Sequence, residues 1–202
     1  PNLAVSSAAG PEDSAIALSI TTTLNDTDNS EALSIWISGV PAGALLTSKG
    51  TTLSFESGTW MAQPSQLDGL TLTPPPNLSG EFSLTVVAKA SENGGGNATT
   101  TQTLALTVAP VADLPALSVA PASGNEDSAI PLTIATALMD TDGSESLAIR
   151  ISGAPSGVVL RSGTISLSPV GGVWTLTPSQ LDSLSITPPA NSDDDFTLTV
   201  VS

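Results

Sequence analysis

Short stretches of alternating apolar and polar residues run along most of this chain. In Ala15–Ile20 the alternation places Ile16 and Ile20 on one face of a strand, and Leu33, Ile35 and Ile37 repeat the pattern. Turn residues separate such stretches at intervals typical of β-sandwiches, beginning with a predicted turn over residues 10–14. Further strands are predicted at residues 45–47, 52–55, 60–63, 70–73, 82–90 and 101–108.

The pattern occurs twice, because residues of the first half return 114 positions later. Trp60 returns as Trp174, and Asp26-Thr27-Asp28 returns as Asp140-Thr141-Asp142. Roughly half of the aligned positions are identical, and a repeat of this length is a whole domain rather than a solenoid unit. The linker over residues 109–115 therefore joins two copies of one domain, residues 1–114 and residues 115–202.

The second copy is expected to lack its last strand. The counterpart of Thr101–Val108 would lie beyond Ser202, either through truncation or through disorder. An exposed sheet edge would result unless another chain covers it.

Composition narrows the function. The chain of 202 residues is 40% apolar, carries a formal charge of −15 and contains neither Cys nor His. This charge disfavours nucleic acid and anionic membranes, and the sequence shows no membrane-spanning run and no signal pattern. Without Cys, His or Tyr most catalytic groups are absent, so we expect no enzyme. A secreted protein without disulfides needs another stabilising cross-link, and a bound metal ion would provide one.

Two acidic loops are the main candidates for metal binding. Asp26, Asp28 and Glu31 place three carboxylates within six residues, and Asp140, Asp142 and Glu145 repeat them. Calcium takes six to eight oxygens and suits such loops, although the EF-hand spacing is absent. The alternative is that these residues simply form turns and cap backbone N–H groups.

A second acidic element, Glu12-Asp13, precedes the second strand and returns as Glu126-Asp127. In an antiparallel sandwich the loops after the first and second strands lie at opposite ends of the domain. Glu12-Asp13 of copy one and the acidic loop of copy two should therefore both face the linker, which carries Asp113. This convergence predicts calcium at the junction of the two domains.

Several phrases as a set resemble the tandem cadherin-like or Ig-like extender repeats of large bacterial RTX adhesins. They are GNEDSAIPLTI, DTDGSESLAIRISGAPSG, VWTLTPSQLDSLSITPPAN and FTLTVV, and the resemblance covers nearly the whole chain. It implies Greek-key β-sandwiches, Ca²⁺ at domain junctions and export within a long surface fibre.

The resemblance also implies a ligand set. The ligands of the one complete junction would be Glu12, Asp13, Asp113, Asp140, Asp142 and Glu145. The N-terminal half-site would hold Asp26, Asp28, Glu31 and Glu92, and the C-terminal half-site Glu126 and Asp127. Asp68 is a further candidate, although Gly69-Leu70 departs from the cadherin pattern after it.

The predicted function is therefore that of a calcium-rigidified spacer in a secreted bacterial adhesin, for cell adhesion or biofilm formation. Its expected partners are neighbouring repeats of the same polypeptide, and no small-molecule substrate is expected. The alternative is a β-sandwich module that binds carbohydrate or another surface ligand. The alternation of its strand predicts that the side chain of Trp36 faces solvent, where it could stack on a sugar. Trp60 and Trp174 are instead expected in the cores of the two domains.

Overall fold

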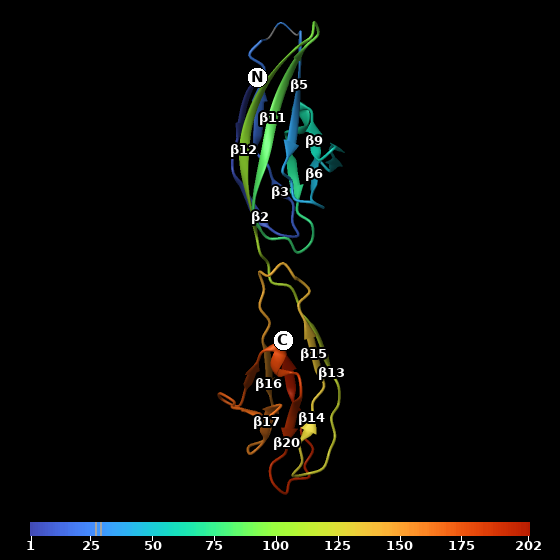
Figure 1. Ribbon diagram of the computed structural model, residues 1–202, viewed down its shortest axis with the longest axis vertical. Helices are drawn as coiled ribbons and strands as arrows, with labels where there is room; N and C mark the ends of the chain where they lie inside the picture. The colour runs from blue at the N-terminus through green and yellow to red at the C-terminus, as the bar shows by residue number, and fades with distance from the viewer. Residues whose placement is uncertain (27, 29) are drawn as a thin grey trace. The chain divides into compact units, whose positions relative to one another are not determined.

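The chain forms two compact units, Pro1–Val111 and Ala112–Ser202, in a computed structural model that describes residues 1–26, 28 and 30–202. Each unit is built from β-strands, and the described residues contain no α-helix (Figure 1). The predicted all-β fold is confirmed, and each unit is a β-sandwich.

Unit 1 contains two larger sheets and a small one. The six-stranded sheet has the order β2-β12-β11-β5-β9-β8, the four-stranded sheet has the order β3-β10-β6-β7, and β1 pairs with β4. Their bounds are β1 Asn2–Val5, β2 Ala8–Pro11, β3 Ile16–Ala17, β4 Ile20–Thr23, β5 Glu31–Ser38, β6 Leu45–Ser48, β7 Thr51–Thr52, β8 Ser54–Glu56, β9 Thr59–Ala62, β10 Leu70–Thr73, β11 Gly80–Glu92 and β12 Gly96–Ala109, with a 3-10 turn over Pro64–Gln66.

The core of unit 1 lies between these sheets and consists of the alternating apolar positions. Ile35 and Ile37 are fully buried from β5, as are Leu84 and Val86 from β11. Trp60 pairs with Ile37 in the ladder of β9 and β5 and is 6% exposed, so it fills the core as predicted. Period-two alternation explains this arrangement, since one face of each strand meets the opposite sheet.

Unit 2 repeats most strands of unit 1 at the same offset, and within its described residues β2, β8 and β12 have no counterpart strand. Its sheets have the orders β13-β15, β14-β20-β17-β18 and β19-β16-β21. Their bounds are β13 Ala116–Val119, β14 Ile130–Pro131, β15 Ile134–Ala137, β16 Ile149–Ser152, β17 Val159–Ser162, β18 Ile165–Leu167, β19 Trp174–Leu176, β20 Leu184–Thr187 and β21 Thr199–Val201, with a 3-10 turn over Pro178–Gln180.

The turns of the two units also match. Gly39 and Gly153 both have positive φ, and a Cβ there would lie 2.6 Å from the carbonyl oxygen of Ser83 and 2.7 Å from that of Thr197. Only glycine fits a position where both the backbone conformation and the neighbouring carbonyl exclude a side chain. Trp174 is 5% exposed and fills the core of unit 2, as predicted.

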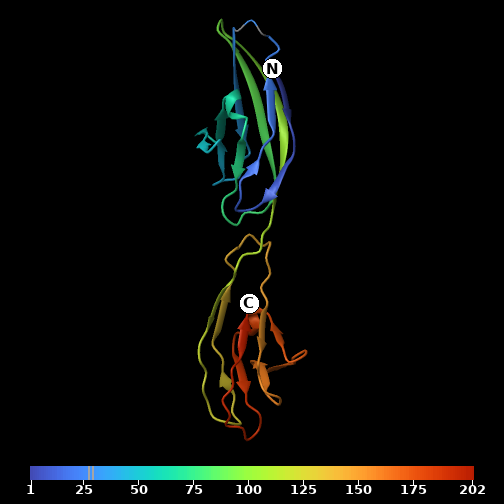
Figure 2. The ribbon, with the colours of Figure 1, turned by 180° about the vertical axis from the view of Figure 1, so that it is seen from behind.

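The clearest difference between the units concerns β2 and β12. Unit 1 has β12, which pairs with β11 and runs parallel to β2. Figure 2 shows the yellow-green β12 beside the dark blue start of the chain. Within the described part of unit 2, β21 pairs only with β16, and residues 122–125, which correspond to β2, form no strand.

Two local expectations were wrong. Residues 15–20 do not form one strand, because Ile16–Ala17 pairs with β10 whereas Ile20 begins β4 in another sheet. The chain crosses from one sheet to the other between these residues, while Ile16, Leu18 and Ile20 all remain buried. The predicted burial pattern was therefore correct, but the prediction of a single strand was wrong. The predicted turn at residues 10–14 begins later, because Ala8–Pro11 forms β2.

Among the described residues, no helix has the length and apolar character needed to cross a membrane.

Candidate functional site

Glu12 lies where β2 ends and is held against the end of β12. Its N–H donates to the carbonyl oxygen of Ala109 at 2.9 Å, and its Oε1 accepts the N–H of Val111 at 2.6 Å. The residue is 2% exposed, and its Oε2 has no hydrogen-bond partner among the described residues. Glu12 therefore binds the first part of the linker with one oxygen and leaves a buried carboxylate oxygen unsatisfied.

Asp13 has a structural role that the sequence did not reveal. It has a φ of 57° and its Oδ1 accepts the N–H of Asn77 at 3.0 Å. The second copy repeats both features, since Asp127 also has a φ of 57° and accepts the N–H of Asn191 at 3.0 Å. Asp tolerates the left-handed region better than most residues, so each Asp closes its turn and ties it to the loop after β10 or β20.

The acidic loop of unit 1 is organised by turns. The Oδ1 of Asp26 accepts the N–H of Asp28 at 3.1 Å, and the Oδ1 of Asp28 accepts the N–H of Ser30 at 2.8 Å. The hydroxyl and backbone amide of Ser30 hold the pKa of Asp28 below its usual value. Thr27 and Asn29, which complete the motif, lie outside the described residues.

Glu31 and Glu92 stand opposite each other at the end of the ladder between β5 and β11. The hydroxyl of Ser30 donates to Oε1 of Glu92 at 3.1 Å. Like charges at directly opposed positions of an antiparallel ladder repel each other. The four carboxylates predicted for the N-terminal half-site therefore all lie at this end of unit 1, with Asp28 and Glu92 both bound to Ser30.

The acidic loop of unit 2 has the same turns. The Oδ1 of Asp140 accepts the N–H of Asp142 at 2.8 Å, and the Oδ1 of Asp142 accepts the N–H of Ser144 at 2.7 Å. The hydroxyl of Ser144 donates to Oδ2 of Asp140 at 3.2 Å. Asp140 is 1% exposed, and carboxylate oxygens of Asp140 and Asp142 lie within 4.8 Å of each other.

Glu145 connects this loop to the linker. Its Oε1 accepts the N–H of Asp113 at 2.5 Å, while its Oε2 is a buried atom with no hydrogen-bond partner in the described part of the chain. Glu12 and Glu145 thus have the same arrangement in their own units: one oxygen on a linker N–H and one oxygen unsatisfied. The sequence predicted both residues as ligands but gave no indication of these backbone contacts.

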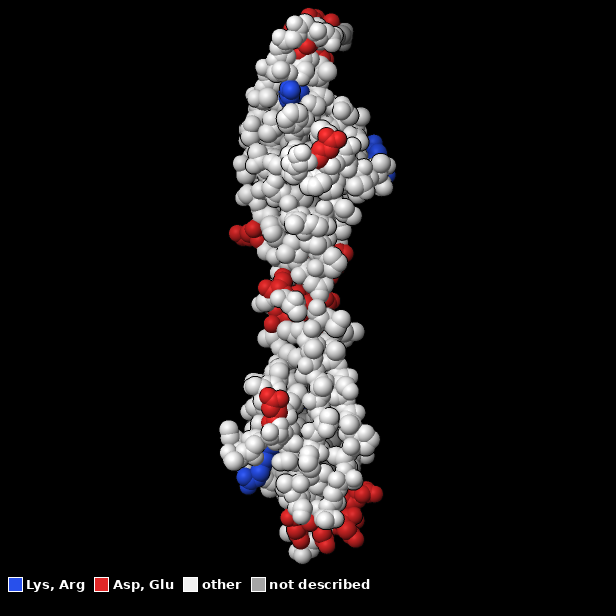
Figure 3. All heavy atoms as spheres, turned by 45° about the vertical axis from the view of Figure 1, so that its right-hand side comes forward, with Lys and Arg blue, Asp and Glu red and all other residues white. Residues whose placement is uncertain are grey.

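Other acidic residues are not assembled in this way. Within either unit by itself, the described residues offer no three acidic side chains whose oxygens lie within 4.8 Å of one another. Glu126 and Asp127 are exposed, as is the run Asp193-Asp194-Asp195. Figure 3 shows acidic side chains gathered mainly at the ends of the units, with few charges on the flanks of this face.

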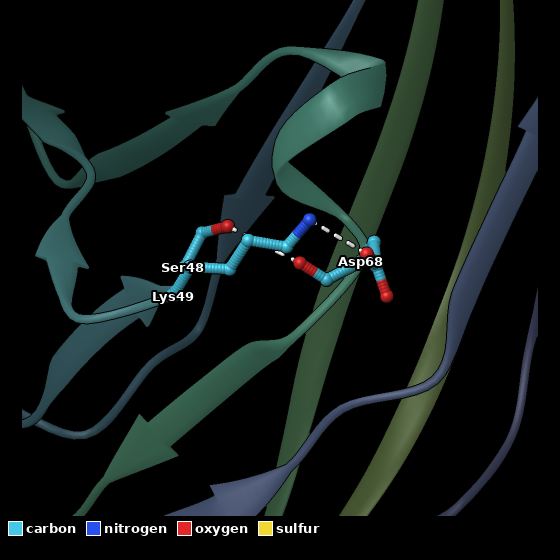
Figure 4. A network of polar contacts seen from close by, with 3 residues as sticks. All are labelled: Ser48, Lys49 and Asp68. Carbon is cyan, nitrogen blue, oxygen red and sulfur yellow. Dashed lines mark hydrogen bonds and ion pairs between the residues drawn. The ribbon is translucent and has the colours of Figure 1, made fainter.

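Asp68 is engaged by a cation of the protein itself. Its Oδ2 lies 2.7 Å from Nζ of Lys49, and its backbone carbonyl accepts the hydroxyl of Ser48 at 3.4 Å (Figure 4). Lys49 lowers the pKa of Asp68 by hydrogen bonding and by charge attraction. This contact accounts for Asp68 without a metal ion.

Trp36 points away from the core, as its alternation predicted. It is 38% exposed, and Nζ of Lys89 lies 5.2 Å from the ring centroid. A lysine on the ring occupies the surface that a sugar would use, and Arg150 stands at the equivalent position of unit 2. This site gives little support to the carbohydrate-binding alternative.

Neither the family models nor the curated proteins contain a match to this chain. Among solved structures, the crystal structure of murine CEACAM1b aligns with 98% of this chain and 90% of that chain, at 14% identity and a TM-score of 0.27. A similarity at this TM-score adds nothing to the fold, which rests on the strands and their pairing.

Proposed function

We propose that this chain is a pair of calcium-rigidified spacer modules from a secreted bacterial surface adhesin. Its role would be to hold a distal binding domain away from the cell in adhesion or biofilm formation. The partners would be neighbouring repeats of the same polypeptide. The role is mechanical rather than catalytic, in keeping with a chain that has no His, Cys or Tyr.

The observation that carries the proposal is the pair of linker contacts made by Glu12 and Glu145. Glu12 accepts the N–H of Val111, and Glu145 accepts the N–H of Asp113, two residues further along the linker. These two hydrogen bonds, each within one unit, therefore hold one carboxylate of each unit against the short linker. Each retains an oxygen without a hydrogen-bond partner, and leaving a carboxylate oxygen unsatisfied is costly.

Calcium would satisfy these oxygens. It takes six to eight oxygen ligands at 2.3–2.6 Å and tolerates irregular geometry. The proposed ligands at the junction are those predicted from the sequence: Glu12, Asp13, Asp113, Asp140, Asp142 and Glu145. The Oδ1 of Asp13 is already used by Asn77, so any contribution from Asp13 would come through its other oxygen.

The consequence would be control of the linker by metal. Without calcium, like charges attached to the linker repel each other and favour bending. With calcium, ligands from both units bind one set of ions and the joint stiffens. Extracellular modules typically bind calcium with dissociation constants of about 10⁻⁴–10⁻³ M, so sites of this kind suit an extracellular protein. Export and surface location belong to this proposal.

Scattering of the full chain tests the proposal directly. Small-angle X-ray profiles would be recorded in EDTA, in 10 mM calcium and in 10 mM magnesium. We expect a narrower distribution of maximum dimensions in calcium than in EDTA, and a smaller effect of magnesium, because magnesium demands octahedral geometry and retains its water. Identical profiles and melting curves in EDTA and calcium would refute the proposal.

A matched pair of variants separates a ligand from a general effect of charge. Glu145→Gln keeps an oxygen that can accept the N–H of Asp113 but removes the charge, so it should weaken calcium binding about tenfold or more. Asp193→Asn removes the same charge from an exposed loop residue and should leave the affinity unchanged. Isothermal titration calorimetry measures both. Equal affinities in the two variants would exclude Glu145 as a ligand.

A further inference from the structure

The hairpin of β11 and β12 carries the single Asn-Gly pair of the sequence, Asn93-Gly94. The two strands are joined by residues 93–95, which form the tip of the hairpin at one end of unit 1 (Figure 1). The N–H of Gly95 donates to the carbonyl oxygen of Glu92 at 3.1 Å, and Gly95 has a φ of 91°, as expected of the glycine that ends a three-residue hairpin loop. Turn geometry therefore accounts for Gly95 and leaves the Asn-Gly pair to be explained.

The two groups of this pair that can react with each other are open to solvent. Residues 93–97 are all exposed, and a Cβ built on Gly94 would meet no atom of the described residues within 4 Å. Within the described part of the chain, the N–H of Gly94 donates to no backbone carbonyl. Glycine also gives the backbone conformational freedom. The nitrogen of Gly94 can therefore approach Cγ of Asn93 without displacing a packed element.

We propose that Asn93 is a site of spontaneous deamidation through a cyclic imide. The nitrogen of Gly94 gives its proton to solvent and bonds to Cγ of Asn93, while the Cγ–Nδ2 bond breaks and Nδ2 takes up a proton and leaves as ammonia. One water molecule then opens the ring. Addition of water at Cγ gives aspartate, and addition at the backbone carbonyl carbon of residue 93 gives isoaspartate. The sum converts amide and water into acid and ammonia, and nothing is oxidised or reduced.

A second exposed Asn of the same hairpin has a different environment. Asn97 is followed by Ala98, whose Cβ hinders the approach of the next backbone nitrogen. The Oδ1 of Asn97 accepts the hydroxyl of Ser91 at 2.8 Å, and the two residues are paired in the ladder of β11 and β12. Both the side chain and the backbone of Asn97 are thus held in place. Asn97 therefore serves as an internal control for exposure to solvent without freedom to close the ring.

Deamidation adds a charge to an end of unit 1 that is already acidic. The N–H of Asn93 donates to the carbonyl oxygen of Ser30 at 3.1 Å, which places residue 93 next to the opposed pair of Glu31 and Glu92. Ser30 also binds the carboxylates of Asp28 and Glu92. A carboxylate at position 93 adds to the repulsion among these groups, because like charges close together on a sheet destabilise it. This end of the unit therefore becomes more negative as the protein ages, without the action of an enzyme.

Tandem mass spectrometry of the full 202-residue chain after incubation at mildly alkaline pH tests the modification. We expect conversion of amide to acid at Asn93 at least about tenfold faster than at Asn97, with isoaspartate among the products. Gly94→Ala keeps Asn93 but adds a Cβ that hinders ring closure, so conversion should slow at least about tenfold. Equal rates at Asn93 and Asn97, or an unchanged rate in Gly94→Ala, would overturn the proposal. Aspartate without isoaspartate would exclude the cyclic route.

Asn93→Asp isolates the effect of the added charge. In EDTA at low salt this variant should melt about 2–4 °C below the parent chain, and high salt should remove the difference because it screens exposed charges. Gln102→Glu is the matched control, since Gln102 is exposed and stands opposite Val86 in the same hairpin. Equal melting of the two variants at low salt would refute the predicted effect of charge. None of these measurements contains calcium, so their outcome is independent of the calcium proposal.

Discussion

Glu31 and Glu92 allow the proposed role of metal to be tested inside one unit. They face each other in the ladder of β5 and β11, where opposed Cβ atoms lie about 5 Å apart. Replacing Glu92 by Gln removes the repulsion and retains an oxygen that can accept the hydroxyl of Ser30. The substitution therefore changes the charge with little change in shape or hydrogen bonding.

The expected magnitude follows from the exposed position of this pair. Two unit charges about 5 Å apart in water repel by roughly 0.8 kcal/mol, and like charges opposed on a sheet cost about 0.2–1 kcal/mol. Relief of about 0.5 kcal/mol corresponds to a rise of about 2–4 °C in the melting temperature of a domain of this size. In EDTA, Glu92→Gln should therefore melt above the parent chain.

Calcium should remove or reverse this advantage, because the variant has lost a proposed ligand. A tenfold weaker affinity at saturating calcium lowers the free energy of unfolding by about 1.4 kcal/mol relative to the parent. Differential scanning calorimetry measures the melting temperature, and hydrogen exchange along β5 and β11 assigns the change to unit 1.

The matched control is Glu81→Gln. Glu81 lies in the same strand but stands opposite Thr107, so this variant changes the net charge equally without relieving an opposed pair. The reasoning would be refuted if Glu92→Gln gained no more than Glu81→Gln in EDTA, or if calcium stabilised all three proteins equally.

Three further predictions concern single features of unit 1. Asp13→Ala should lower the free energy of unfolding by about 0.5–1.5 kcal/mol in chemical denaturation because the exposed hydrogen bond from the N–H of Asn77 is lost, whereas Asp13→Asn should cost less than half as much; equal losses would contradict this role. Gly39→Ala should lower the free energy of unfolding more than Gly58→Ala in the same assay. Both glycines have positive φ, but of the two only Gly39 has a backbone atom within 4 Å of the added Cβ. Equal decreases in the free energy of unfolding would show that this contact is relieved at little cost. The folded-state pKa of Asp28 is lowered, so its contribution to stability is present above its unfolded pKa of about 3.9 and is lost as pH falls through the folded value. Asp28→Asn should therefore lose less stability than the parent chain as pH falls below about 4. An unchanged pH dependence of stability in this range would contradict the lowered pKa.

The sequence predicted the strands and the core well because those depend on local pattern. The buried alternation of Ile35 and Ile37 and the internal position of both repeated Trp residues follow from period two and from the duplication. The parallel pairing of β2 with β12 was missed because Gly10-Pro11 has the composition of a turn, and nothing local identifies a partner about a hundred residues away.

The candidate site was predicted only as a set of residue types. The recurrence of the acidic motifs identified the carboxylates, but it could not show which oxygens were already used. Asp13 and Asn77 lie 64 positions apart, as do Asp127 and Asn191, but every repeated pair keeps its spacing in a gapless duplication, so nothing in the sequence indicated this contact.

The parallel pairing of β2 and β12 determines how unit 1 would respond to tension. Ala8–Pro11 enters from the start of the chain, and its partner Leu106–Ala109 leads out into the linker. Pulling on the two ends would slide these parallel strands past each other, so the hydrogen bonds of this ladder would bear the load together instead of breaking one at a time.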